Sequence, residues 1–454
     1  MKIIDTLKNV WKITELKDRI MLTLGLLLVY RFGAQVVLPG IDINKLGGLQ
    51  DGTSDGILGL LNAFTGGAFA NASVFALGIM PYISASIVVQ LMGIAIPYLQ
   101  KLQKEGASGQ KKITQITRWL TIGICLVQAP GYLASVPALS GAQSMGSLLL
   151  PGFSENIFYV SSVIILVTGC VFAMWLGEKI TDKGIGNGIS LLIMVGIIAT
   201  LPQSFIQNAA SRLDGGNGGF MMILIELVIW FLIILASVFL VMAVRKIAVQ
   251  YARRTASGGY EKNVFGSRQF LPLKLNASGV MPIIFAQAIM FVPGLIGGSS
   301  FMKDSAAGQW MQTNFSDIFG FWYNLVFALL IIIFTYFYTA ITVPTNKMAD
   351  DLKRSGGFIP GIRPGSETSE YLDKIMSQIT LPGSIFLALI AVFPAFIVKL
   401  LGVQQGWALF FGGTSLLIMV GVAIDTMQQI NSYLLNKHYD GLMKTGKNRK
   451  AVAQ

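Results

Sequence analysis

Long apolar runs bounded by polar or charged residues dominate the pattern along this chain of 454 residues. Ten runs are suited to cross a bilayer, because a hydrocarbon core of about 30 Å takes about 20 helical residues. They cover 20–38, 72–97, 116–136, 155–176, 186–206, 219–243, 276–297, 317–340, 377–398 and 405–425. Pro81, Pro282 and Pro382 interrupt three of them, which a membrane bundle tolerates because neighbouring helices satisfy the freed backbone groups. The pattern predicts an all-α polytopic membrane protein with ten transmembrane helices.

One apolar stretch is too long for a single crossing. Residues 57–91 carry no charged side chain, and two glycines, Gly66 and Gly67, interrupt them. Before the glycines, Leu58, Leu61 and Phe64 recur at three-residue spacing, as on one face of a helix. We therefore expect a short half-helix at about 57–70 beside the full span.

Composition and charge support a membrane protein and set its orientation. Apolar residues make up 53% of the chain and charged residues 12%, about half the charged share of soluble domains. Of the 34 lysines and arginines, 29 fall in loops on one side of the predicted spans, which makes that side and both termini cytoplasmic. Residues 1–19 place their apolar side chains on one helical face, so we expect an amphipathic helix in the cytoplasmic interface and no cleavable signal peptide.

Few residues could carry covalent chemistry. Cys125 and Cys170 lie in predicted spans and His438 is the single histidine, so we expect no disulfide, metal site, cofactor or enzymatic activity. Glu226 is the one acid well inside an apolar run; we expect it near the outer interface, and an ion-coupling role is the alternative. A small-solute secondary transporter, the alternative function, would be expected to bury more charge at mid-membrane.

Two runs carry a stripe that changes from branched apolar to small or polar residues. The stripes comprise Ile79, Ile83, Ser86 and Gln90 in the second run, and Ile189, Ile193, Gly196 and Thr200 in the fifth. A water-filled vestibule closed by an isoleucine collar would use such stripes, since a hydrophobic constriction excludes ions by dewetting. Ordinary packing between helices would use them too, and spacing alone leaves the two interpretations even. A purely structural scaffold has less need of polar residues below an apolar collar.

Several long motifs resemble the SecY family, which supplies the channel subunit of Sec protein translocases. They are LGIMPYISASIVVQL (77–91), KEGASGQKKITQITRW (104–119), MWLGEKITDKGIGNGIS (174–190), YARRTASGG (251–259), LPLKLNASGVMPIIFA (271–286), ADDLKRSGGFIPGIRPG (349–365) and FGGTSLLI (411–418). They occur in the family's order, and the resemblance extends from about Lys17 to the tail.

The resemblance implies a clamshell of two inverted five-helix halves. The N-terminal half would be 20–206 and the C-terminal half 219–425, joined by an external hinge loop at 207–218. Cytoplasmic loops would lie at 244–275 and 341–376, and a cytoplasmic tail at 426–454. Unfolded secretory proteins would cross an hourglass pore, and membrane segments would leave sideways through a lateral gate.

The resemblance also implies roles for particular residues. A pore ring would consist of Ile79, Ile83, Ile189, Ile193, Ile284 and Ile418. The half-helix would be a plug that closes the outer funnel, and a re-entrant loop that never moves is the alternative; its residues are Leu58, Leu61, Phe64, Gly66 and Gly67. Polar residues of the lateral gate, which ordinary interhelical hydrogen bonding would also explain, are Ser84, Gln90, Asn276 and Gln287. The docking surface for the SecA ATPase and the ribosome would include Arg253, Arg254 and Arg363.

Other implied partners are the SecE and SecG subunits, signal sequences, secretory polypeptides and membrane lipids, in the inner or plasma membrane.

Two departures from the family pattern stand out. The chain has Gly258-Gly259-Tyr260 where many bacterial relatives carry an arginine pair, so the ribosome contact is expected to differ there. It has Val343-Pro344 where relatives often have Asn-Pro.

Overall fold

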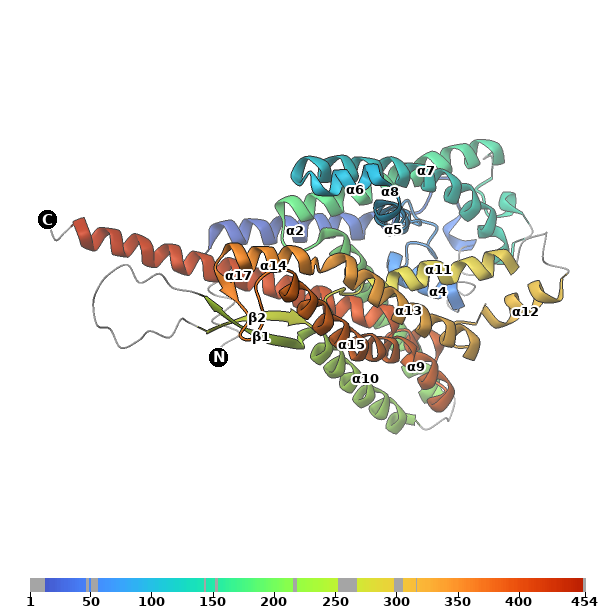
Figure 1. The fold of residues 1–454 in the computed structure, drawn as a ribbon. Helices are drawn as coiled ribbons and strands as arrows, with labels where there is room; N and C mark the ends of the chain where they lie inside the picture. The colour runs from blue at the N-terminus through green and yellow to red at the C-terminus, as the bar shows by residue number, and fades with distance from the viewer. Residues whose placement is uncertain are drawn as a thin grey trace, which may run out of the picture. The chain divides into compact units, whose positions relative to one another are not determined.

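A helix occupies the greater part of each predicted span in the part of the chain that the structure describes (Figure 1). The computed structural model describes residues 13–45, 49, 56–142, 144–151, 154–214, 219–251, 268–297, 305–315 and 317–451. The long helices are α2 (Thr14–Gly33), α5 (Met80–Ala95), α7 (Ala107–Ser140), α8 (Glu155–Lys183), α9 (Gly188–Asp214), α10 (Gly219–Met242), α11 (Met281–Gly297), α13 (Phe321–Thr342), α15 (Ser366–Leu401) and α17 (Gly413–Ala451). The predicted interfacial helix 1–19 lies mostly outside these residues, and its described end continues into α2.

Seven of the described helices are long and apolar enough to span a bilayer, or eight if α5 and the short α6 (Pro97–Lys104) form one bent span. The remaining two long helices have identifiable differences. α2 carries Lys17, Asp18, Arg19 and Arg31, and α11 is 17 residues long. The apolar runs thus predicted the positions of the helices. By length and composition alone, however, α2 is too charged and α11 too short to count as a membrane span.

Two of the three prolines expected to interrupt spans instead lie at helix starts. Pro81 and Pro282 occupy the first turns of α5 and α11, where the missing N–H has no intrahelical partner to lose. Residues 72–79 form turns rather than the start of a helix, and Gly78 there adopts φ +53°. Pro382 alone of the three lies inside a helix, α15. The runs 72–97 and 276–297 thus change from turns to helix at these prolines, and each helix begins later than predicted.

The chain divides into two compact units. Unit 1 comprises Met1–Gly219, Val403–Leu409 and Val422–Gln454, and unit 2 comprises Phe220–Gly402 and Phe410–Gly421. α9 continues to Asp214, so most of the predicted external loop 207–218 is helical and the rest lies outside the described residues. The arrangement as two inverted halves stays a prediction.

Unit 2 contains a small antiparallel sheet that the sequence analysis did not predict. β1 (Val244–Tyr251) pairs with β2 (Arg268–Lys274) from Val244 opposite Lys274 to Gln250 opposite Arg268, and the two lie side by side in Figure 1. On its other edge, β1 pairs with the two-residue β3 (Gly357–Phe358). The sheet therefore joins the loop after α10 to the loop after α13.

The sheet packs on α14 (Thr345–Arg354) and the first turns of α15. Ile247 and Val249 alternate with more exposed residues along β1 and point into this contact, which is the period-two pattern of a half-buried strand. Their buried partners include Leu352, Leu372 and Ile375. We call β1, β2, β3, α14 and residues 359–379 the cytoplasmic module, after the two predicted cytoplasmic loops to which most of them belong; the side of the membrane on which they lie stays a prediction.

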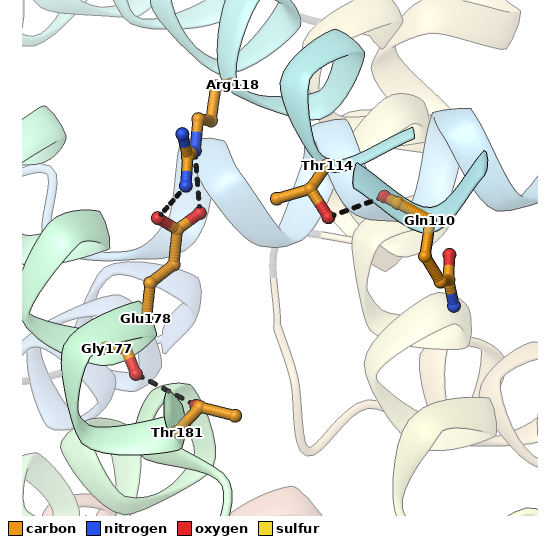
Figure 2. A network of polar contacts seen from close by, with 6 residues as sticks. All are labelled: Gln110, Thr114, Arg118, Gly177, Glu178 and Thr181. Carbon is orange, nitrogen blue, oxygen red and sulfur yellow. Dashed lines mark hydrogen bonds and ion pairs between the residues drawn. The ribbon is translucent and has the colours of Figure 1, made fainter. Parts of the chain in front are cut away.

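In unit 1, a bidentate ion pair fixes α7 to α8. Figure 2 shows the guanidinium of Arg118 facing the carboxylate of Glu178, with Nε 3.0 Å from Oε1 and Nη2 2.6 Å from Oε2. Parallel N–H···O bonds of this kind combine strength with a defined geometry. One turn further along α8, Thr181 donates to the carbonyl of Gly177 and accepts from the backbone N–H of Gly188, both at 2.9 Å. These contacts hold the beginning of α9 against the end of α8.

Candidate plug and pore site

The predicted half-helix is α4 (Gly56–Thr65), and it ends in a glycine turn. Gly66 adopts φ +68° and donates to the carbonyl of Ala63 at 3.2 Å, while Gly67 donates to the carbonyl of Asn62 at 2.9 Å. These two bonds form a Schellman motif, which needs a left-handed residue just after the helix and so favours glycine there. The half-helix therefore ends at the two glycines, about five residues before the predicted end at about 70.

The last turn of α4 contacts three other elements of unit 1. The Nη1 atom of Arg31, in the last turn of α2, donates a hydrogen bond to the carbonyl of Gly66. A Cβ atom at Gly66 would lie 2.8 Å from the Cα of Gly196 on α9, and a Cβ at Gly78, just before α5, would lie 3.0 Å from Cγ2 of Thr65. Three glycines thus let α2, the start of α5 and α9 approach the end of α4 closely.

Hydrogen bonds also hold the segment that returns from α4 to α5. The hydroxyl of Tyr132, on α7, donates to the carbonyl of Phe69 at 2.8 Å, and their rings pack edge to face. The side chain of Asn62 accepts from the backbone N–H of Ala70 at 3.0 Å. Backbone bonds from Leu38 to Ala72 and from residue 74 to residue 36 tie the segment to the chain after α2. We call residues 56–78 the plug region, which comprises the predicted half-helix of about 57–70 and the turns that follow it, and which ends before Ile79 of the predicted pore ring.

The predicted plug residues lie inside the protein. Phe64 and Gly66 are buried, whereas Leu58, Leu61 and Gly67 are half-buried. Leu58 packs against the buried cluster that contains Tyr132 and its neighbours on α7. A segment too short to cross a bilayer can remain at membrane depth when protein surrounds it.

Four of the predicted pore-ring isoleucines belong to unit 1. Ile79 is buried directly before α5, and Ile83 is half-buried one turn later. On α9, Ile193 is buried and lies one turn before Gly196, so the stripe of α9 is on the face that meets the end of α4. Ile189 is different, because its Cγ1 would lie 2.9 Å from a Cβ at Gly177. This contact with α8 supports a packing role for at least part of the Ile189 side chain.

The other two ring isoleucines belong to unit 2. Ile284 is half-buried on α11, and Ile418 is buried on α17. The structure therefore places the unit 1 members around the start of α5 and along α9, near the plug region. Convergence of all six side chains on one waist stays a prediction.

Three of the predicted gate residues hydrogen-bond within their own segments. Ser84 donates to the carbonyl of Met80 at 3.1 Å. The amide of Gln90 donates to Ser86 at 3.3 Å. The side chain of Asn276 accepts a hydrogen bond from Ser278 at 3.2 Å.

Gln287 on α11 behaves differently. It is buried, and its Oε1 atom has no hydrogen-bond partner among the residues that the structure describes. An unpaired buried carbonyl costs about 1 to 3 kcal/mol, so Gln287 favours any rearrangement that supplies a donor. A hydrogen bond between the gate helices stays a prediction.

Of the predicted docking residues, only Arg363 is described; Arg253, Arg254 and the Gly258-Gly259-Tyr260 departure lie outside the described residues. The side chain of Arg363 is 88% exposed, and its nearest ionic partner is Glu367, with N and O atoms 3.8 Å apart. Its carbonyl accepts from the hydroxyl of Thr368 at 2.9 Å, and Gly361 and Gly365 on either side adopt φ +86° and +120°. The backbone thus presents an exposed guanidinium from a turn with defined geometry.

The sequence analysis missed three residues that position the plug region: Arg31, Asn62 and Tyr132. Arg31 carried a usable signal, because it is the one charged residue in the apolar run 20–38. Asn62 is likewise one of the few polar residues in the half-helix. Nothing local marks Tyr132, because its partner lies 63 positions away in the sequence.

The expected position of Glu226 near the outer interface stays a prediction, but the structure shows that its side chain is buried within the protein. It is 1% exposed on α10, within unit 2. The expectation came from its distance to the end of the apolar run, which gives depth along the helix but not the face it occupies.

Among the described residues, no group of three or more His, Cys, Asp or Glu side chains could hold a metal ion.

Comparisons with known proteins identify the family of this chain. The SecY family model matches residues 73–427. The protein translocase subunit SecY of Streptomyces coelicolor is 40% identical over 443 residues, which cover 96% of this chain and 98% of that protein. The SecY subunit of Escherichia coli K12 is 39% identical over 433 residues, 95% of this chain and 94% of that one.

Solved structures share the fold at lower sequence identity. A protein-conducting channel superimposes with a TM-score of 0.60 at 17% identity and 91% coverage of both chains. A SecY structure described for a plug domain that stabilises the closed channel gives 0.59 at 18% identity, again with 91% of each chain covered. The alternative of a small-solute secondary transporter is set aside by these relatives. The chain therefore belongs to the SecY family, and its expected function, as a non-enzymatic protein-conducting subunit of a Sec translocase, is confirmed at the level of the family.

Proposed function

We propose that the chain conducts unfolded secretory proteins through a pore ringed by the six isoleucines, and that the plug region closes this pore at rest. The observation that carries the proposal is the contact of the α4 end with Gly196. That contact puts the half-helix on the same face of α9 as Ile193, one turn away. A plug and a pore ring must be neighbours in this way if one is to seal the other.

The chemistry of the closed state follows from these side chains. A ring of branched aliphatic groups excludes water and ions by dewetting, yet it deforms around a larger polypeptide. α4 contains no charged residue, so it adds a further apolar barrier without trapping ions. The chain itself breaks no covalent bond; a partner ATPase, the ribosome or the membrane potential would supply the driving force.

The plug region is proposed to swing away when a polypeptide enters. A few directional hydrogen bonds from side chains connect it to the rest of unit 1. Each is worth about 0.5 to 1.5 kcal/mol, or about 1.5 to 3 kcal/mol when the donor is charged. A re-entrant segment of this kind is removable without breaking a transmembrane helix, because α4 and α5 are separated by the turns of residues 66–79.

Deleting residues 58–66 tests the proposal. The variant should still export a secretory protein, whereas its resting ion conductance in planar bilayers should rise well above that of the wild type. Conductance that stays at the wild-type level would contradict the plug assignment and leave α4 as a static re-entrant helix.

We propose that α5 and α11 carry the two sides of a lateral gate. Polar contacts in membranes are typically worth about 0.6 to 2 kcal/mol, so a hydrophobic signal sequence could displace a few of them. The Oε1 of Gln287, unpaired among the described residues, supports a role for this position in an exchange of hydrogen-bond partners when the gate opens. Gln90→Leu and Asn276→Leu should restore export of a protein with a weakened signal sequence, and no restoration in either variant would count against the gate.

We propose that the cytoplasmic module docks SecA and the ribosome. The sheet supports this, since it joins the two loops that carry Arg253, Arg254 and Arg363. A related channel in a canine ribosome–channel complex shares the fold with a TM-score of 0.55. SecE and SecG complete the proposed complex, in a plasma membrane with both termini of this chain in the cytoplasm.

A further inference from the structure

Arg31 is the one charged residue in the run 20–38, and neither the proposed pore ring nor the proposed gate includes it. It lies in the last turn of α2, where a cation is favoured by the partial negative charge of the helix end. Arginine within a predicted span is costly unless it has a partner. In the structure, its Nη1 atom donates to the carbonyl of Gly66, the residue that ends α4.

Neighbouring contacts hold both partners of this hydrogen bond in position. The ring of Tyr30, beside Arg31, stacks on Phe75 of the plug region with centroids 5.5 Å apart. A Cβ at Gly33 would lie 2.2 Å from the same Phe75 ring, so the end of α2 and the plug region are in close contact. On the other partner, the Schellman turn fixes the direction of the Gly66 carbonyl.

We propose that Arg31 is the latch of the closed channel: its guanidinium holds the plug region by the Gly66 carbonyl, and this bond must break before the plug moves. The inference rests on the proposed function of α4 as a plug. Arg31 acts as a positioning residue, since it touches the plug and not the transported chain. Among the residues that hold the plug region, Arg31 supplies the one charged donor in the described hydrogen bonds.

The test compares the resting ion conductance of purified, reconstituted variants. Arg31→Met keeps length and apolar bulk but removes the donor, and should raise conductance roughly tenfold or more, as loss of a charge-assisted bond implies. Arg31→Lys keeps the charge with a single ammonium donor and should give an intermediate rise. Arg19→Met is the matched control, because Arg19 lies on the same helix and pairs with Glu15 instead. It should leave conductance unchanged.

A second arm places Arg31→Met in the channel that lacks residues 58–66. If the latch acts through the plug, the substitution adds nothing in this background. An additional rise there would show that Arg31 acts elsewhere and would overturn the latch.

The two proposals fail in distinguishable ways. Wild-type conductance in both Arg31 variants, together with a leaky deletion variant, would refute the latch and keep the plug. Wild-type conductance in the deletion variant itself would refute the plug, and with it the latch.

Discussion

The plug region of unit 1 and the cytoplasmic module of unit 2 are both inserted between long helices, but different forces hold them. The plug region has little regular structure after α4, and side chains from α2 and α7 hold its carbonyls. The cytoplasmic module relies on a continuous backbone ladder and on a closed cluster of aliphatic residues. Glycines allow close approach in the first region, whereas buried leucine and isoleucine fill the second.

The difference indicates how each region is used. A few directional bonds can be lost one at a time, so the plug region suits a part that has to be released. A cooperative sheet with its own core does not rearrange easily, so it can hold Arg363 in a fixed position. Two readouts separate these behaviours: resting ion conductance reports on the plug region, and SecA-driven export reports on the cytoplasmic module.

The largest effect is expected for Arg363→Glu. The side chain is 88% exposed and its one ionic neighbour is 3.8 Å away, so reversing its charge should cost little stability. It should nevertheless reduce SecA-driven export by about tenfold or more, since a reversed charge at a docking site repels the partner. Vesicle export assays measure this, with Glu367→Gln as the control that removes only the local ion pair. Unchanged export by a properly inserted Arg363→Glu protein would refute the docking role.

Leu372→Ala should loosen the cytoplasmic module. Leu372 is fully buried beneath the sheet, and truncating such a leucine typically costs about 2 to 5 kcal/mol. Export should fall several-fold as Arg363 loses its support, while resting conductance stays at the wild-type level. Limited proteolysis of the cytoplasmic loops should report the loosening. Leu381→Ala, at an exposed position of the same helix, should change none of these measurements.

Gly196→Ala should disturb the plug region alone. A Cβ at this position would lie 2.7 Å from the carbonyl oxygen of Phe64, and overpacking of this kind costs about 1 to 3 kcal/mol. Displacement of α4 should raise resting conductance several-fold and leave SecA-dependent export intact. Gly131→Ala on α7 is a matched control, since no described atom from a neighbouring segment lies within 4 Å of the added Cβ. A tight channel with alanine at 196 would show that α4 does not seal against α9.

The smallest effect is expected for Tyr132→Phe. The substitution removes the 2.8 Å hydrogen bond to Phe69 but keeps the aromatic contact. Losing one neutral hydrogen bond costs about 1 kcal/mol, so conductance should rise by less than in the Arg31 variants. An increase equal to that of Arg31→Met would contradict the ranking of the two contacts.

The sequence predicted the helices well because the bilayer imposes a length and an apolar composition that can be read directly. It also predicted α4, since Gly66 and Gly67 end the helix for a local reason. It placed the start of α5 too early, because buried turns and buried helix have the same apolar composition. Residues 72–79 are mostly apolar since the protein surrounds them, and the turns show in the backbone, where Ala72 and Gly78 adopt φ of +45° and +53°.

The parts of the site that could not be predicted depend on long-range contacts. The bond between Arg31 and Gly66 joins positions 35 residues apart, and no local pattern encodes it. The strands were missed because their charged, short sequences look like ordinary cytoplasmic loops; the alternation of Ile247 and Val249 was the available signal. Spacing placed Ile189 and Ile193 on one stripe but could not show that Ile189 packs against Gly177.

The most direct test of the account is crosslinking of a stalled secretory polypeptide to single cysteines in the pore ring. Cysteines would replace Ile79 and Ile193 in unit 1 and Ile284 in unit 2, with the exposed Val127 and Leu400 as lipid-facing controls. The account predicts crosslinks from all three ring positions to the same short stretch of the polypeptide, and none from the controls. Crosslinks from one unit only, or equal reaction of the controls, would contradict a common pore.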